Sequence, residues 1–382
     1  MRNKILYPLL IIIIIFVTIE LSSYLASRYN LLIFNNPPDI YLKKKDSKIE
    51  MYWHEKNIWG AWHKKNFTTR HKKSCFDVEY RTNEIGARDD PFLNLQNQKN
   101  IILLGDSFAE GLGIEKNNMF ERIVENKIDL NVLNFASSKD FGILQYYIIY
   151  KYLAKEYPHD KILISLLINN DFKDNDLDYF KKYNLDKINN RTRLRPYYKK
   201  DKSDFTIIYP SNAQKIHENT NVFLKNHFWT SNVLRTIKYL YVSKNIRDEK
   251  KLFFINDNIS LPKHITDYYY TPIHQQEAGI FFLEKIITEN LDKKIYLFSI
   301  PLYEDYLSIK KNDIRNEIYW YKKLKKFEYE YNNFNFLDLY DYADDNYNKF
   351  FSPNVCDGHW NEKGHKWAGD IISKFILHKK VN

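Results

Sequence analysis

The chain has 382 residues, of which 44% are hydrophobic and 28% are charged, and its formal net charge is +10. The hydrophobic content excludes a wholly disordered chain, and at roughly 100–200 residues per domain the length suggests one large domain or two smaller ones. Ten Gly and 11 Pro exclude collagen-like and Gly/Pro-rich proteins. Two Cys exclude a disulfide-rich scaffold and a four-thiolate zinc site.

The positive charge admits nucleic acid, an anionic membrane surface or an acidic polymer as a partner. The lysines occur in short scattered runs such as Lys43 to Lys45, and no RNA-binding module, zinc finger or basic-zipper pattern accompanies them. The pattern is typical of a solvated, lysine-rich surface, and we expect no nucleic-acid partner.

An apolar run over residues 5–26 begins the chain, and Glu20 interrupts it near its end. At 1.5 Å per residue the run spans about 33 Å, which is enough to cross the hydrocarbon core of a bilayer. It predicts a membrane anchor behind a cytoplasmic tail of residues 1–4. A cleaved signal peptide is the alternative, although residues 22–27 contain no clear small-x-small cleavage site. Basic residues flank the run on both sides, so charge alone leaves the orientation open.

Residues 27–77 are predicted to be a linker and an irregular lead-in, and beyond them short apolar runs alternate with longer amphipathic ones. The predicted strands are 100–104, 132–136, 161–168, 294–300 and 334–339, and the predicted helices are 118–127, 142–156, 275–289, 313–331 and 360–377. Such alternation predicts an α/β fold over residues 78–378, in which a parallel sheet lies between two layers of helices in a three-layer sandwich.

Residues 172–270 lack this alternation and are rich in Tyr, Lys and Asn, with one helical pattern at 232–242. We interpret this stretch as an insertion above the strand ends that serves as a lid or substrate platform. The alternative is an irregular elaboration without a role in binding.

Polar residues follow two of the predicted strands. Gly105, Asp106 and Ser107 end the first strand, and a Ser on a tight strand-to-helix turn is exposed where backbone N–H groups face a developing anion. Asn170 and Asp171 end the third strand, where an amide side chain can donate into the same cleft. Each motif alone is weak evidence for an active site, because ordinary strand-end turns and helix caps contain the same residue types.

A third motif precedes the last predicted helix. Asp357 lies two residues before His359, close enough to orient an imidazole that acts as the base for an activated Ser. The alternative is a capping Asp and a structural His. The three motifs together predict a nucleophile, a donor and a base at the carboxyl edge of one sheet.

In order and placement these motifs resemble the blocks of the SGNH (GDSL-type) hydrolase superfamily, and residues 80–88 look like the lead-in of its bacterial membrane-anchored members. The resemblance covers roughly residues 78–377 and implies a flavodoxin-like sheet. It also implies a catalytic triad of Ser107, His359 and Asp357. The implied oxyanion donors are the Ser107 N–H, a backbone N–H near Lys139 and the Asn170 side chain, with Gly105, Asp106 and Asp171 in support.

The sequence departs from the family pattern at two places. Lys139 occupies a position that is normally Gly, and a side chain there restricts φ and crowds the site. Asn169 replaces the Gly of the third block, although Asn tolerates unusual φ values better than most residues. Both replacements bear on the turnover rate and on the size of the substrate.

The resemblance implies an acyl ester as substrate, and with the anchor it points to O-acetyl groups on an envelope or secreted polysaccharide. The sequence leaves open whether water or a sugar hydroxyl resolves the acyl-enzyme. We expect a single-pass protein of the bacterial inner membrane with its domain in the periplasm and an envelope complex as candidate partner. The alternatives are a non-catalytic glycan-binding or scaffold subunit and a lipid esterase at the membrane surface.

We expect no cofactor and no metal, because the spacing of His54, His63 and His71 fits no zinc motif and is interpreted as surface or packing. His365 is interpreted as a packing or capping residue. Cys75 and Cys356 both belong near the same sheet edge, and an oxidising periplasm would permit a disulfide between them. Two unpaired thiols are the alternative.

Overall fold

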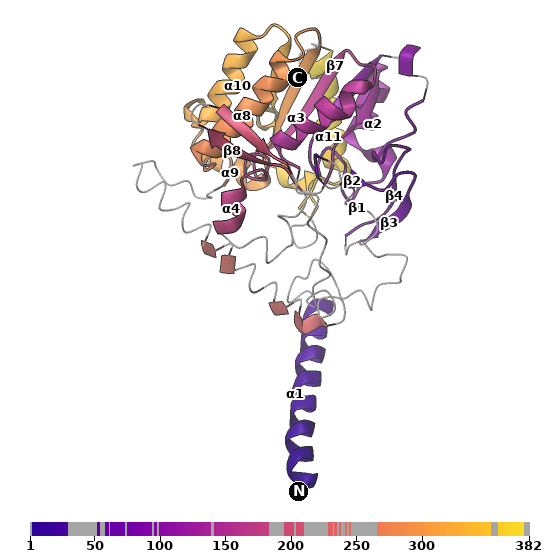
Figure 1. The fold of residues 1–382 in the computed structure, drawn as a ribbon, viewed down its shortest axis with the longest axis vertical. Helices are drawn as coiled ribbons and strands as arrows, with labels where there is room; N and C mark the ends of the chain where they lie inside the picture. The colour runs from indigo at the N-terminus through magenta and orange to yellow at the C-terminus, as the bar shows by residue number, and fades with distance from the viewer. Residues whose placement is uncertain are drawn as a thin grey trace.

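The computed structural model describes residues 2–29, 52–182, 195–209, 228–245, 266–352 and 358–377, with gaps at 54–57, 61, 73–74, 94, 98, 139–140, 202–203, 232, 235–236, 238–240 and 243. Helix α1 (Arg2–Arg28) projects from a body of strands and helices (Figure 1). Its span Leu6–Ala26 has a mean hydropathy of 2.4 and is long and apolar enough to cross a membrane.

Five parallel strands form the central sheet in the order β11-β10-β7-β5-β6. Their bounds are β5 (Asn100–Leu104), β6 (Asn131–Asn134), β7 (Lys161–Leu167), β10 (Lys294–Ile300) and β11 (Phe334–Asp338). Numbered along the chain this is the order 2-1-3-4-5, in which the direction of winding reverses between β5 and β7. Ligands bind beyond the carboxyl ends of strands at such a reversal.

The sheet is buried on both faces because most residues of its strands are apolar. In β5 every residue is buried, and successive side chains alternate between two cores. Ile102 and Leu104 belong to the core beneath α3 (Ile143–Tyr152), α8 (Ile273–Thr288) and α10 (Tyr319–Glu330). Ile101 and Leu103 belong to the core beneath α2 (Phe120–Ile128) and α11 (Glu362–Ile376). The three-layer α/β fold predicted from the sequence is confirmed (Figure 1).

Several elements were not predicted. Three antiparallel pairs join β1 (Tyr52–Trp53) to β2 (Trp62–His63), β3 (Thr68–Lys72) to β4 (Asp77–Arg81), and β8 (Tyr197–Asp201) to β9 (Asp204–Ile208). Further helices are α4 (Leu177–Lys182), α9 (Tyr303–Lys311) and the 3-10 turns Leu95–Asn97, Lys116–Asn118, Ala154–Glu156, Arg315–Glu317, Leu339–Tyr342 and Tyr347–Phe350.

Two segments differ from their predicted form for packing reasons. Helix α10 begins at Tyr319, not at 313. Residues 315–317 form a separate 3-10 turn, whose Arg315 is held by ion pairs with Asp313, Asp338 and Asp341. Phe172 and Tyr268, at the two ends of the predicted insertion, are buried in the main core. Both ends of that stretch therefore belong to the packed body.

Candidate active site

The structure brings Ser107 and His359 together although 252 positions separate them. Ser107 follows β5, His359 precedes α11, and the His359 Nε2 lies 2.7 Å from the Ser107 Oγ. This is hydrogen-bond distance, and it is the geometry in which an imidazole can take the proton of an attacking hydroxyl. The pair lies where the winding of the sheet reverses, between the ends of β5 and β7.

Tight packing fixes the turn that carries Ser107. A Cβ at Gly105 would lie 2.5 Å from the Ala109 Cβ and 2.9 Å from the Ser165 Cβ, so no side chain fits there. Asp106 is buried, and its Oδ1 accepts a hydrogen bond of 3.0 Å from the Phe108 N–H. Gly105 and Asp106 thus hold the backbone of this turn, and their supporting role in catalysis stays a prediction.

Burial raises the pKa of the Asp106 carboxyl above its ordinary value. The Phe108 N–H, the nearby His359 and the Asn170 side chain act in the opposite direction and offset part of the rise. The Ser107 Oγ also lies 3.4 Å from the Asp106 Oδ2, so Asp106 is in contact with the nucleophile.

The end of β7 carries the predicted donor Asn170 and its neighbour Asp171. Asp171 is buried, and its Oδ2 accepts a hydrogen bond of 2.7 Å from the Leu167 N–H. Burial, together with the nearby Asp106, raises the pKa of Asp171 well above its ordinary value. The Asn170 Nδ2 donates to the Asp174 Oδ2 at 3.0 Å, which uses one of the two hydrogens on that nitrogen.

Three predicted site residues, Lys139, Asp357 and Cys356, lie outside the described residues. The oxyanion role of Lys139 and the orienting role of Asp357 stay predictions. Cys75 is disulfide-bonded, and Cys356 is the other cysteine of the sequence. The pairing of the two also stays a prediction.

The loop that carries His359 is held by backbone bonds and aromatic rings. The Ser352 N–H donates to the His359 carbonyl at 2.7 Å, and Phe351 pairs with Trp360 in an antiparallel bridge. Trp360 is fully buried, and the Phe108 ring lies 4.9 Å from the His359 ring. Phe108 thus connects the nucleophile turn directly to the base.

Glu110 is a functional candidate that the sequence analysis missed. It is fully buried three residues after the nucleophile, and its carboxylate accepts hydrogen bonds from the Ser138 N–H and, at 2.9 Å, from the Ser138 Oγ. The His63 Nε2 lies 3.2 Å from the same carboxylate. Ser138 immediately precedes Lys139, so Glu110 fixes the start of the loop that is predicted to supply an oxyanion donor.

Arg88, in the predicted lead-in, binds the backbone of the segment that follows Ser107. Its guanidinium donates to the carbonyls of Glu110 at 3.0 Å, Gly111 and Ile114 at 2.6 Å, and it lies 4.1 Å from the Tyr80 ring centroid. The guanidinium thereby satisfies successive carbonyls of the segment that follows Ser107. The only sequence signal for this role is the resemblance of residues 80–88 to the lead-in of membrane-anchored relatives.

Of the other histidines considered in the sequence analysis, His54 lies outside the described residues. His63 and His71 are buried, not at the surface. The buried His365 Nδ1 accepts a hydrogen bond of 3.1 Å from the Phe120 N–H, and burial lowers the pKa of this imidazole to about 3. Within the described part of the chain, no group of His, Cys, Asp and Glu is arranged to hold a metal ion.

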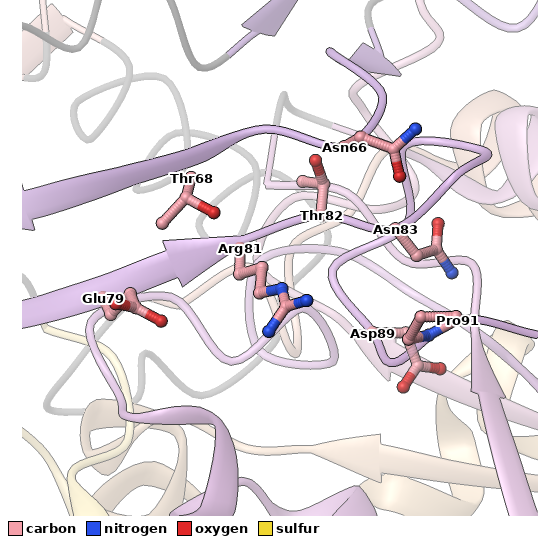
Figure 2. A pocket seen from close by; sticks show the side chains of 8 residues that line it. All are labelled: Asn66, Thr68, Glu79, Arg81, Thr82, Asn83, Asp89 and Pro91. Carbon is pink, nitrogen blue, oxygen red and sulfur yellow. The ribbon is translucent and has the colours of Figure 1, made fainter.

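A polar pocket of about 360 Å³ lies in the lead-in, apart from the catalytic pair (Figure 2). It opens at the β3–β4 hairpin and the loop that follows it, and neither Ser107 nor His359 lines it. Burial raises the pKa of its Asp89 to about 6. The side chains lining it are those of Asn66, Thr68, Glu79, Arg81, Thr82, Asn83, Asp89 and Pro91.

No protein-family model matches the sequence, and a search of curated proteins gives no match. Among solved structures, the chain is similar to a carbohydrate esterase family 2 enzyme of Corynascus thermopiles (Myceliophthora fergusii), with 12% identity and a TM-score of 0.37 over 73% of this chain and 66% of that one. It is also similar to a putative G-D-S-L family lipolytic protein of Desulfitobacterium hafniense, with 13% identity and a TM-score of 0.34 over 72% and 98% of the two chains.

A third similar structure is an acetyl xylan esterase from the rumen bacterium Butyrivibrio proteoclasticus, with 9% identity and a TM-score of 0.31 over 73% and 63% of the two chains. This chain thus spans slightly less than two thirds of the length of each of the two esterases, the family 2 enzyme and the acetyl xylan esterase. At such low similarity, a functional assignment depends on the geometry of the site.

Proposed function

We propose that this protein is a serine acyl-ester hydrolase or O-acyltransferase of SGNH type. The observation that carries the proposal is the 2.7 Å contact between the Ser107 Oγ and the His359 Nε2 at the reversal point of the sheet. A nucleophile and a base in hydrogen-bond contact, at the edge where α/β sheets bind ligands, form the minimal unit for acyl transfer.

In this mechanism Ser107 attacks the ester carbonyl while the His359 Nε2 takes its proton, and the same imidazole then protonates the leaving alcohol. Asp357 is proposed to orient the imidazole through its other nitrogen. Water or a sugar hydroxyl next attacks the acyl-enzyme, with His359 again as the base, and Ser107 is released with its proton restored.

The tetrahedral oxyanion is proposed to be stabilised by the Ser107 N–H, a backbone N–H near Lys139 and the Asn170 side chain. The Ser107 N–H donates no hydrogen bond to any part of the chain that the structure describes. Loss of one oxyanion donor typically costs on the order of 10²–10³ in rate.

The proposed substrate is an O-acetyl ester on an envelope or secreted polysaccharide. The membrane-spanning length of α1 supports an envelope location, and the resemblance of the motifs supports an acyl ester. The proposal includes an extracytoplasmic domain, a single-pass anchor in the bacterial inner membrane, and an envelope complex as a partner.

The test is turnover of p-nitrophenyl acetate by the full-length protein in detergent micelles, beside the Ser107→Ala variant. We expect turnover that the variant lacks. An acetylated polysaccharide is then offered with and without a second glycan as acceptor. Free acetate identifies a hydrolase, and an acetylated acceptor identifies a transferase.

Asn118→Ala is a suitable matched control, because Asn118 is exposed and its side chain bonds Glu362 rather than Ser107 or His359. Turnover that persists in Ser107→Ala, or a folded protein with no turnover on any ester, would contradict the proposal. The second result would favour a non-catalytic glycan-binding subunit.

A further inference from the structure

Glu20 is the one acidic residue of α1, and it lies inside the span Leu6–Ala26. A carboxylate in a membrane-spanning helix is costly unless it has partners. Here its Oε2 accepts hydrogen bonds from the Thr230 N–H at 3.0 Å and the Thr230 Oγ1 at 2.7 Å, and its Oε1 accepts from the Trp229 N–H. Three donors from a segment more than 200 positions away thus satisfy this carboxylate.

Aromatic contacts flank these hydrogen bonds. Phe16 packs against Phe228 with ring centroids 5.4 Å apart, and Tyr24 packs against Trp229 at 5.6 Å. Positions 16, 20 and 24 are spaced four apart, so they form one stripe along α1. The stripe contacts the start of the inserted segment, which makes the outer part of α1 a component of the folded protein.

Beyond this contact, each residue from 229 to 245 that the structure describes is helical. Leu234, Ile237 and Tyr241 are exposed by 63%, 54% and 65%, and their spacing places them on one face. The sequence of segment 228–245 contains three basic residues and no acidic one, namely Arg235, Lys238 and Lys244. Exposed apolar side chains in a segment with basic residues are typical of elements that bind an anionic bilayer surface.

The far end of the segment returns to the body of the protein. Val242 packs beside Tyr197 of β8, together with Leu177 and Tyr179 of α4. The segment therefore contacts α1 through Phe228 at one end and the body through Val242 at the other.

We propose that segment 228–245 is a lipid-binding element that lies on the bilayer beside an uncleaved α1, with Leu234 and Ile237 in contact with lipid. The bilayer is the occupant because the exposed apolar face begins next to residues of the membrane-spanning window. Trp229 and Tyr24 belong to the residue types that concentrate at membrane interfaces. The contact through Glu20 holds the catalytic body at a fixed position over the membrane surface.

The test uses the full-length protein in nanodiscs of mixed neutral and anionic lipids, part of which carry a spin label near the head group. An environment-sensitive fluorophore is attached to Ile237→Cys under non-reducing conditions. Tyr329→Cys is the matched control, because Tyr329 is 90% exposed on α10 of the body. We expect several-fold stronger lipid quenching at position 237 than at position 329.

Glu20→Leu and Glu20→Gln then test the contact with α1. Leu removes every acceptor while making the helix more apolar, so the protein stays inserted but quenching at position 237 falls toward that at position 329. Gln keeps an acceptor oxygen and retains most of the quenching. Equal quenching at positions 237 and 329 in the wild type, or quenching at 237 that Glu20→Leu leaves unchanged, would overturn the proposal.

The mass of the mature protein provides a second readout. Protein isolated from membranes should retain residues 1–28, because cleavage would remove the partner of Trp229 and Thr230. A mature chain that begins beyond Glu20 would overturn the proposal. Neither readout depends on ester hydrolysis, so failure here is distinguishable from failure of the proposed activity.

Discussion

The turn that carries Ser107 is surrounded by buried charged groups, whereas the loop that carries His359 is held by backbone hydrogen bonds and aromatic packing. On the nucleophile side, Glu110 binds Ser138 and Arg88 binds three carbonyls. On the histidine side, Trp360 is fully buried and the Ser352 N–H holds the His359 carbonyl.

The difference predicts unlike responses to substitution. Removing one member of a buried charged network leaves the others without partners, which is far costlier than loss of a neutral contact. Loss of a backbone hydrogen bond or of a helix cap lowers the free energy of unfolding by a smaller amount. We therefore expect substitutions on the nucleophile side to reduce both stability and activity, and substitutions on the histidine side to reduce mainly stability, by a smaller amount, His359 itself excepted.

The two sides also respond oppositely to pH. Burial raises the pKa of Asp106, so its contribution to stability falls as pH rises through its ordinary value toward its folded one. Burial lowers the pKa of His365, so its contribution is lost as pH falls.

The largest effect is expected from His359→Gln. The variant keeps a polar side chain but cannot act as the base, so kcat for p-nitrophenyl acetate should fall by about 10²–10⁴-fold. Thermal unfolding should be nearly unchanged, since His359 is only partly buried. A fall of less than three-fold would show that the imidazole is not the base.

The next largest effect is expected from Glu110→Ala, which frees both hydrogen-bond donors of Ser138. Displacement of the loop that is proposed to carry the Lys139 donor should reduce kcat by about ten-fold to 10²-fold while KM changes little. Ser138→Ala removes only the hydroxyl bond and should have a smaller effect. The nucleophile side would not be the sensitive one if Glu110→Ala lost stability but kept full kcat per folded molecule.

A smaller effect, on stability, is expected from Asn361→Ala. The Asn361 Oδ1 caps α11 by accepting from the Gly364 N–H at 3.1 Å, and its Nδ2 donates to the carbonyls of Lys349 and Phe351. The free energy of unfolding in urea should fall by about 1–2 kcal/mol. Asn361→Asp keeps the cap and should lower the free energy of unfolding by less. A large fall in kcat with unchanged stability would reverse the comparison.

The smallest effect at neutral pH is expected from His365→Asn. This substitution should instead change how stability depends on pH. The folded pKa of His365 is about 3, so between pH 6.5 and 3 the unfolded chain binds the proton more readily and wild-type stability falls as pH falls. The contribution is at most about 1.4 kcal/mol per pH unit. Stability of the variant, measured by urea unfolding at several pH values, should lack this component. Parallel curves for the two proteins would contradict the assignment.

The sequence predicted best what depends on local pattern. Strands 100–104 and 294–300 have the predicted bounds because each is a short apolar run between polar residues. The positions of Ser107 and Asn170 followed from the predicted strands 100–104 and 161–168, since a parallel sheet brings the carboxyl ends of its strands to one edge.

Long-range contacts account for what the sequence did not predict. Nothing in the local sequence of Glu110 indicates its contact with Ser138, which lies 28 positions away across the sheet edge. The late start of α10 depends on Asp338 and Asp341, which reach Arg315 from the end of β11. Glu20 was predicted only to interrupt an apolar run, because its partners lie more than 200 positions further along the chain.

The proposed activity depends above all on Ser107 being a nucleophile that His359 activates. The most direct measurement is intact-protein and peptide mass spectrometry after exposure to a fluorophosphonate, which labels activated serines. We expect one adduct, located on Ser107, that is absent in Ser107→Ala and forms far more slowly in His359→Gln. A folded protein without an adduct, or an adduct that persists in Ser107→Ala, would contradict it.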